Sequence, residues 1–313
     1  MLLKRNVPPF FYLRNIKYEM LVVICISVAI GYLHKFQFAE EIAVPYVIPT
    51  VLGTAISLLL AFRTNQSYER WWEARKIWGA VVNDSRSIAR QFINFTGFEL
   101  HKPSKPKLSQ MNLDEKSQIV LKSVQAQATF CQVLARQLRG LDTEQLLAKY
   151  FSGEDYEYLK AFKNRANAIL LFIGRQANIL YEKSVITDFQ LQTIESSLVN
   201  LTADLGKCER IKNTPFPQPY SVCLHAYIYI FAAILPLALL NFSILEETLL
   251  SSTLSIIFLL IEKTAMLKED PFENRPTDIS MNQMANNIER SIMEMLGENV
   301  TIAYEDVGKY YVL

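Results

Sequence analysis

The sequence holds few of the residues that metal centres and disulfide frameworks require. Its 313 residues include only 3 histidines and 4 cysteines. The histidines, His34, His101 and His225, are scattered along the chain, so they provide no cluster for a metal ion or a nucleophile relay. The cysteines, at positions 25, 131, 208 and 223, show no short paired spacing, and two lie in apolar stretches. We therefore expect reduced cysteines, no metal and no cofactor.

Sequence signatures of enzymes are also missing. The chain has no His-Glu-x-x-His pair, no phosphate-binding Gly-x-x-x-x-Gly-Lys loop and no Gly-x-Ser-x-Gly elbow. Charge of one sign is lacking too, because 32 basic residues nearly balance 31 acidic ones. A nucleic-acid-binding protein would concentrate positive charge on one face. The sequence thus predicts neither an enzyme nor a nucleic-acid-binding protein.

What the sequence does have is apolar length. Half of the residues are apolar and a fifth are charged, as expected when membrane spans and a water-exposed region share one chain. Four apolar segments stand out, at residues 20–33, 42–62, 222–242 and 248–261. The second is uncharged throughout and, at about 1.5 Å per residue, crosses the roughly 30 Å of a bilayer core. The first reaches that length only if Lys35 snorkels, and the fourth is short enough to be a buried soluble helix instead.

The charges that flank these segments predict a topology. Basic residues precede the first segment and follow the second, namely Lys4, Arg5, Arg14, Lys17, Arg63, Arg70, Arg75 and Lys76. The other two connections are acidic and carry Glu40, Glu41, Glu246 and Glu247. The positive-inside rule then places both termini in the cytoplasm of a multi-pass protein of the cell (inner) membrane. The expected order is a cytoplasmic segment (1–19), two spans (20–62), a cytoplasmic helical region (63–219), two spans (220–262) and a cytoplasmic C-terminal segment (263–313).

The central region has helical periodicity. Apolar residues recur at three and four positions, which predicts helices over residues 70–95, 114–139, 155–182 and 187–212. Gly97, Gly140 and Gly206 are the expected helix stops. The fold class is therefore an all-α membrane protein with four transmembrane helices and a large cytoplasmic helical region.

The second span contains a regular apolar stripe. Thr54, Leu58 and Phe62 recur every four residues, and at 100° per residue they lie within about 80° of one another on one face. An equally regular stripe consists of Val51, Ala55 and Leu59. Either stripe can face lipid or other helices, so periodicity alone does not choose a functional face.

Four blocks of sequence resemble those of a known protein family. They are Leu-Ala-Phe-Arg at 60–63, Asn-Gln-Ser-Tyr-Glu-Arg-Trp-Trp-Glu-Ala-Arg-Lys-Ile-Trp-Gly at 65–79, Cys-Glu-Arg-Ile-Lys-Asn-Thr-Pro-Phe-Pro-Gln-Pro-Tyr-Ser at 208–221 and Glu-Asp-Pro-Phe-Glu-Asn at 269–274. In order and spacing the chain resembles the bestrophin family of ion channels in its compact bacterial form, over nearly its whole length. The resemblance implies a homopentamer in membrane lipid, with four spans per subunit around a central pore.

The resemblance also implies two constrictions. A hydrophobic neck inside the membrane falls on Thr54, Leu58 and Phe62, and a cytoplasmic aperture falls on Phe216 before Pro217. Thr54 departs from the larger aliphatic side chain expected there, and its hydroxyl would ease wetting of the neck. From the residues alone, a packed side chain in a proline-braced turn is the favoured interpretation of Phe216, and the resemblance favours the aperture instead. Arg63 is expected as an interfacial anchor, with attraction of anions as the alternative.

Two further groups of ionisable residues have a simple interpretation. Eukaryotic bestrophins carry an acidic calcium clasp after the last span, but here Lys268 and Pro271 interrupt the run, so we expect no clasp. The remaining carboxylates, Glu269, Asp270 and Glu273, are expected in a solvated loop or a helix cap. His225, near the start of the third span, is expected to be hydrogen-bonded packing rather than a functional group.

The permeant ion is the least determined property. The wider family favours chloride and other small anions, whereas a monovalent cation (sodium) channel of the same fold is the alternative. Glu40, Glu41, Glu246 and Glu247 would concentrate cations if they rimmed the outer entrance. A non-conducting helical membrane scaffold is the third possibility, and it would tolerate charge on the stripe of Thr54, Leu58 and Phe62.

Overall fold

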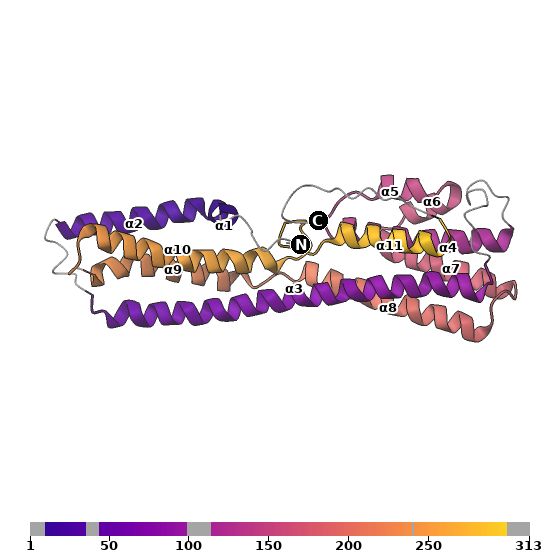
Figure 1. The fold of residues 1–313 in the computed structure, drawn as a ribbon, viewed down its shortest axis with the longest axis horizontal. Coiled ribbons are helices and arrows are strands. Elements are labelled where there is room, and N and C mark those ends of the chain that lie inside the picture. Colours follow the sequence, from indigo (N-terminus) through magenta and orange to yellow (C-terminus); the bar gives the residue numbers. More distant parts are fainter. Residues whose placement is uncertain (1–9, 36–43, 99–113, 240, 299–313) are drawn as a thin grey trace. The chain divides into compact units, whose positions relative to one another are not determined.

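The protein is built from α-helices. The computed structural model describes residues 10–35, 44–98, 114–239 and 241–298, and within these ranges every regular element is helical (Figure 1). The expected all-α class is thereby confirmed. Backbone contacts divide the chain into two compact units. We call residues 4–72 and 215–271 the apolar unit, and residues 1–3, 73–214 and 272–313 the polar unit.

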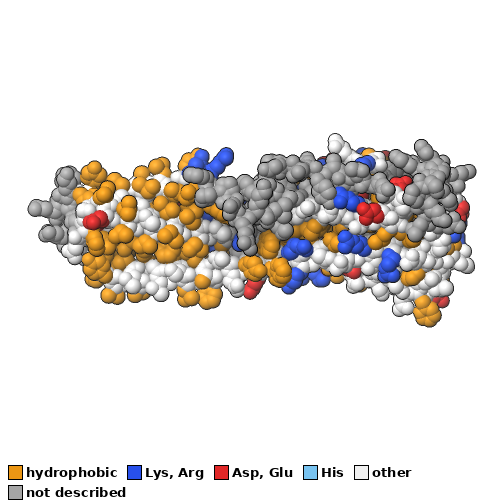
Figure 2. All heavy atoms as spheres, viewed as in Figure 1, with side chains coloured by type: hydrophobic (Ala, Val, Ile, Leu, Met, Phe, Trp, Pro, Cys, Tyr) orange, Lys and Arg blue, Asp and Glu red, His pale blue; other side chains and the backbone are white. Residues whose placement is uncertain are grey.

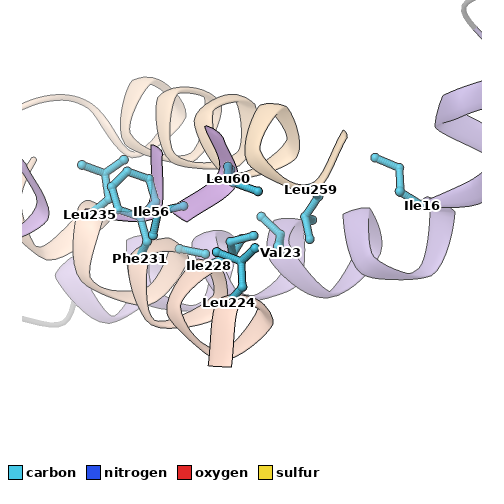
Figure 3. Packing of buried hydrophobic residues seen from close by; sticks show 10 residues of the cluster. Ile16, Val23, Ile56, Leu60, Leu224, Ile228, Phe231, Leu235 and Leu259 are labelled. Carbon is cyan, nitrogen blue, oxygen red and sulfur yellow. The ribbon is translucent and has the colours of Figure 1, made fainter. Parts of the chain in front are cut away.

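The apolar unit is a bundle of long helices. It contains α1 (Phe10–Asn15), α2 (Lys17–Lys35), the first part of α3 (Val47–Phe95), α9 (Gln218–Ala238) and α10 (Ile244–Glu269). Helix α2 packs against both α9 and α10, which also pack against each other. Side chains from α2, α3, α9 and α10, and Ile16 between α1 and α2, bury a common core. It is formed by Ile16, Val23, Ile56, Leu60, Leu224, Ile228, Phe231, Ala232, Leu235 and Leu259 (Figure 3).

Three of the described helices are long and apolar enough to cross a membrane, namely α3, α9 and α10. The short fourth segment, residues 248–261, lies within a helix of 26 residues, so its length no longer argues against a span. The first segment lies within α2, a helix of 19 residues. Hydrophobic side chains cover much of the drawn surface of the apolar unit (Figure 2). In water such a surface would be unfavourable, whereas lipid accommodates it.

The polar unit combines the second part of α3 with six further helices. These are α4 (Glu115–Gln137), α5 (Glu144–Tyr150), α6 (Gly153–Lys160), α7 (Arg165–Glu182), α8 (Asp188–Asn213) and α11 (Met281–Met295). Helix α4 is central, because α5, α7 and α11 all pack against it, and α7 also packs against α8. Lys, Arg, Asp and Glu side chains are scattered over the drawn surface of this unit, as expected for a region in water (Figure 2).

Two of the expected helix boundaries in this unit are wrong. The predicted helix over residues 155–182 is two helices, because the Asn164 side chain accepts a hydrogen bond from the backbone N–H of Asn167 at 3.1 Å and starts α7. Gly206 is not a stop, since α8 continues to Asn213. Gly97 and Gly140 do follow helix ends, with φ of +60° and +66° that glycine adopts without strain.

Candidate functional site

Helix α3 has one face buried in the apolar unit. Ile56 is fully buried, Leu60 is 2% exposed, and both join the core with Phe231 of α9 and Leu259 of α10. Figure 3 shows Ile56 beside Phe231 and Leu235 of α9. Arg63 and Ser67 extend this buried face by one and two further turns. The spacing of three to four residues is that of a single helical face.

The opposite face of α3 carries the expected neck residues. At 100° per residue, the stripe of Thr54, Leu58 and Phe62 lies about 170° from the mean direction of Ile56, Leu60 and Arg63. Thr54 is exposed in the single chain, Leu58 is 58% exposed and Phe62 is 57% exposed. Val51 and Ala55 of the alternative stripe are exposed as well, and Leu59 is half-buried. The fold of one chain therefore leaves this face of α3 open, with two large apolar side chains on it.

The hydroxyl groups on this face are already engaged. Thr54 Oγ1 donates to the backbone oxygen of Thr50 at 2.8 Å, and Thr50 Oγ1 donates to that of Tyr46 at 2.7 Å. Each hydroxyl has one hydrogen, so what remains available at Thr54 is the acceptor lone pairs of its oxygen. Thr54 thus presents a polar acceptor at the position where an aliphatic group was expected.

The expected aperture residue lies beside α3. Pro217 is exposed and caps the start of α9, while the half-buried Phe216 precedes it. The Phe216 ring meets the Tyr220 ring edge-on, with centroids 5.6 Å apart. Its other neighbour is Arg63, whose Cζ lies 5.4 Å from the centroid of the ring. Phe216 is therefore held between a residue of α9 and a residue of α3.

Arg63 is neither an interfacial anchor nor an exposed anion attractor. Its side chain is fully buried, and its Nη1 donates to Glu262 Oε1 at 2.6 Å. Its Nε and Nη2 donate to Glu269 Oε1 at 3.0 and 2.8 Å. A charge that is buried this deeply persists only when it is paired and hydrogen-bonded. Arg63 thus ties α3 to α10 within the apolar unit.

Glu262 and Glu269, the two partners of Arg63, each have a further polar contact. Nδ1 of His225 lies 3.0 Å from Oε1 of Glu262, which is 1% exposed, so His225 has the polar partner that was expected. The backbone oxygen of Glu269 accepts from Nε of Arg70 at 2.5 Å. Of the two expectations for Glu269, a solvated loop or a helix cap, the loop is wrong, because Glu269 is the last residue of α10 and is paired with Arg63.

Sequence reasoning did not find Glu262. Its position one residue after an apolar run marked it as an ionisable group at the edge of a span, which is a signal of a functional or structural role. Its partners, however, lie on α3 and α9. Nothing in the local pattern around residue 262 indicates those partners.

The other acidic residues that the structure describes have separate surroundings. Ser243 and Glu246 form a capping box at the start of α10, and Glu247 is buried in the apolar unit. Glu40 and Glu41 lie outside the described residues. Glu273 pairs with Lys212 at 2.5 Å, and Asp270 caps the end of α10. In the part of the chain that the structure describes, no group of three or more His, Cys, Asp or Glu side chains could hold a metal ion.

The cysteines are all unpaired thiols. Cys131 and Cys208 are buried in the polar unit, and Cys25 and Cys223 are exposed in the single chain. Burial raises the pKa of the Cys131 thiol to about 12, although the neighbouring Ser85 hydroxyl opposes the shift. Burial likewise raises the pKa of Cys208 to about 12, with Asp204 adding to the effect. Both thiols are packing groups rather than nucleophiles.

A bundle of long apolar helices joined to a helical region rich in ion pairs defines an α-helical membrane protein. Its family follows from comparison with known proteins. The sequence model of the bacterial and fungal bestrophin proteins matches residues 12–294. The chain belongs to the bestrophin family, which confirms the resemblance drawn from its sequence blocks.

Relatives and solved structures agree with this assignment. A voltage-dependent anion channel-forming protein of Ralstonia nicotianae is 28% identical over 90% of this chain and 87% of its own. The voltage-dependent anion channel-forming protein YneE of Salmonella typhi is 30% identical over 84% and 81%. The crystal structure of a bacterial bestrophin homologue from Klebsiella pneumoniae matches with a TM-score of 0.79 and 28% identity, over 91% of this chain and 100% of that one.

Proposed function

We propose that this protein is a homopentameric channel that passes small anions, chloride foremost, through a central pore in the cell (inner) membrane. Three lines of support meet in this proposal. The chain is a bestrophin, and its relatives are named anion channel-forming proteins. In addition, the fold of one chain leaves an apolar face of α3 open. A channel function, rather than an enzymatic one, also agrees with the missing enzyme signatures.

Each subunit would contribute four spans with both termini in the cytoplasm. Helices α3, α9 and α10 have the length and hydropathy for this role, and α2 packs against α9 and α10 as the fourth member of the bundle. The basic residues Arg14, Lys17 and Arg70 lie at the ends of spans that this topology assigns to the cytoplasm.

The pore would have two narrow places. Five copies of Thr54, Leu58 and Phe62 would form the neck, and five copies of Phe216, each followed by Pro217, would form the cytoplasmic aperture. A narrow ring of apolar side chains disfavours water and so gates conduction by dewetting, with no ion-binding group on the wall. The Thr54 oxygen would let water enter the outer end of this neck more readily than an aliphatic group.

The observation that carries the proposal is the opposition of the two faces of α3. One face is fully used by the subunit's own core, and the other exposes Leu58 and Phe62. Recording of the purified protein in planar bilayers under a salt gradient tests it. An anion channel gives a reversal potential near the equilibrium potential of chloride. A silent bilayer would instead favour the non-conducting scaffold.

A cation channel of the same fold is the second candidate, and the exposed Glu69 of α3 supports it. Within residues 47–72, the exposed acidic Glu69 accepts a hydrogen bond from the Asn65 side chain at 3.0 Å. Arg63, by contrast, is buried and neutralised by Glu262 and Glu269. Negative charge near a pore mouth raises the local concentration of cations. The opposite sign of the same reversal potential would establish this reading.

A further inference from the structure

Phe216 is attached to α3 by two separate contacts. The first is the guanidinium of Arg63, which lies over the ring at 5.4 Å, within the range of a cation–π interaction. The second passes through Tyr220, whose ring meets Phe216 edge-on at 5.6 Å. The Tyr220 hydroxyl donates a hydrogen bond to the backbone oxygen of Leu59 at 2.9 Å. Both contacts therefore end on the short stretch of α3 between Leu59 and Arg63.

One attachment point lies within the stretch of the proposed neck, and the other directly follows it. Leu59 directly follows Leu58 in the chain, and Arg63 directly follows Phe62. In an α-helix the carbonyl of residue 59 also accepts the amide of residue 63, so both contacts meet at one turn of the helix. A rotation or tilt of that turn moves Leu58, Phe62 and the support of Phe216 together.

The Arg63 guanidinium that contacts Phe216 is itself held in place by carboxylates. Three of its guanidinium nitrogens donate to Glu262 and Glu269, and the group has no exposed surface. The planar fork of arginine fixes its direction when several donors are engaged at once. The face that Arg63 offers to Phe216 is thus set by α10 as well as by α3.

We propose that Arg63 and Tyr220 are positioning residues that couple the cytoplasmic aperture to the neck, so that the two constrictions change together. This inference rests on the proposed function, because it takes the stripe of Leu58 and Phe62 as the neck and Phe216 as the aperture. It goes further in stating that neither constriction is an independent gate. A substitution of Phe216 must then change how open the neck is at Leu58.

A reporter at the neck tests this coupling. A Leu58→Cys channel is recorded in a bilayer, and the rate at which a charged, water-soluble thiol reagent blocks its current measures how open the neck is. The same reagent on the parent channel gives the baseline for the native cysteines. Tyr220→Phe is then added, because it removes only the hydroxyl that reaches Leu59 and leaves the ring beside Phe216. We expect the blocking rate to change several-fold.

Two further variants complete the design. Phe216→Leu keeps an apolar side chain and removes the aromatic face, and it is expected to change the blocking rate at Leu58→Cys as well. In the Phe216→Leu background, Tyr220→Phe is expected to add little, because Phe216→Leu has already removed the ring contact through which Tyr220 acts on residue 216. Tyr227→Phe serves as the control, since Tyr227 lies on α9, is 39% exposed, and is expected to leave the rate unchanged.

Arg63→Lys is the stronger but riskier change, because it disturbs a buried ion cluster, so it is interpreted only if the oligomer assembles as in the parent. The coupling is overturned if Tyr220→Phe and Phe216→Leu leave the neck rate unchanged, or if their effects simply multiply. A Leu58→Cys channel that conducts but is never blocked, or a parent that never conducts, contradicts the proposed function and the coupling with it.

Discussion

The two faces of α3 differ in what holds them in place. Ile56 and Leu60 pack against α9 and α10, and Arg63 is paired with two carboxylates of α10. This face is therefore needed for one chain to fold. Thr54, Leu58 and Phe62 are exposed, and the folded single chain does not depend on them. Residues two positions apart on the same helix are thus subject to different requirements. The buried face serves stability, and we assign the open face to conduction.

The largest loss of stability on the buried face of α3 is expected from a substitution of Arg63. Arg63→Ala removes the guanidinium from Glu262, which is 1% exposed and keeps only the His225 ring of these two partners. Losing one partner of a buried ion pair costs about 3–5 kcal/mol. We expect a large loss of folded oligomer, measured by size-exclusion chromatography and thermal unfolding in detergent.

Arg165→Ala is the matched control for that change. Arg165 pairs with Asp142 and Glu144, whose side chains are 61% and 42% exposed. Ion pairs in contact with water contribute about 0–1 kcal/mol, so the control should assemble normally. Equal losses for the two variants would mean that the burial of Arg63 does not matter.

A pair of identical substitutions compares the faces directly. Leu60→Ala removes a side chain that is 2% exposed, and such core truncations cost about 2–5 kcal/mol. Leu58→Ala removes one that is 58% exposed in the single chain, and we expect about 0.5 kcal/mol or less. Thermal unfolding in detergent measures both. The reverse order of the two losses would exclude the assignment of the faces.

Thr54→Ile sharpens the comparison within the open face. The substitution replaces a hydroxyl that bonds to Thr50 by an apolar group, so the neck should dewet more often. We expect a several-fold lower open probability in single-channel recordings, with unchanged thermal stability. An unchanged open probability would show that wetting at residue 54 does not limit conduction.

The smallest effect is expected at the buried thiols. With pKa values of about 12, Cys131 and Cys208 are ionised in about one molecule in ten thousand at pH 8. A thiol reagent that requires the thiolate should therefore leave both unmodified in the folded protein, and react with them after denaturation. Mass spectrometry of the labelled chain measures this. Rapid labelling of Cys131 before unfolding would contradict its burial.

Much of the fold could be predicted because its signals are local. The helices expected over residues 114–139 and 187–212 are α4 and α8, and Asp114 and Thr187 cap their starts. The break before α7 was missed, because it depends on a cap at Asn164 and on Gln137, whose side chain accepts from Ala166 N–H at 3.2 Å. That contact joins residues 29 positions apart.

The candidate site was only half predictable for the same reason. Periodicity gave two stripes on the second span, and only the packing of α9 and α10 shows that Ile56 and Leu60 face inward. Arg63 was expected at an interface because its partners, Glu262 and Glu269, are about two hundred residues away in the chain. The roles of Phe216 and Pro217 at an aperture stay a prediction.

The central claim is that the open face of α3 lines the ion pathway, and Leu58→Glu tests it most directly. Five added carboxylates around a narrow pore would favour cations strongly. Under a salt gradient, the reversal potential of the Leu58→Glu channel should therefore shift toward the equilibrium potential of the cation, with the oligomer intact. A variant that assembles and keeps the parent's conductance and reversal potential would contradict the account.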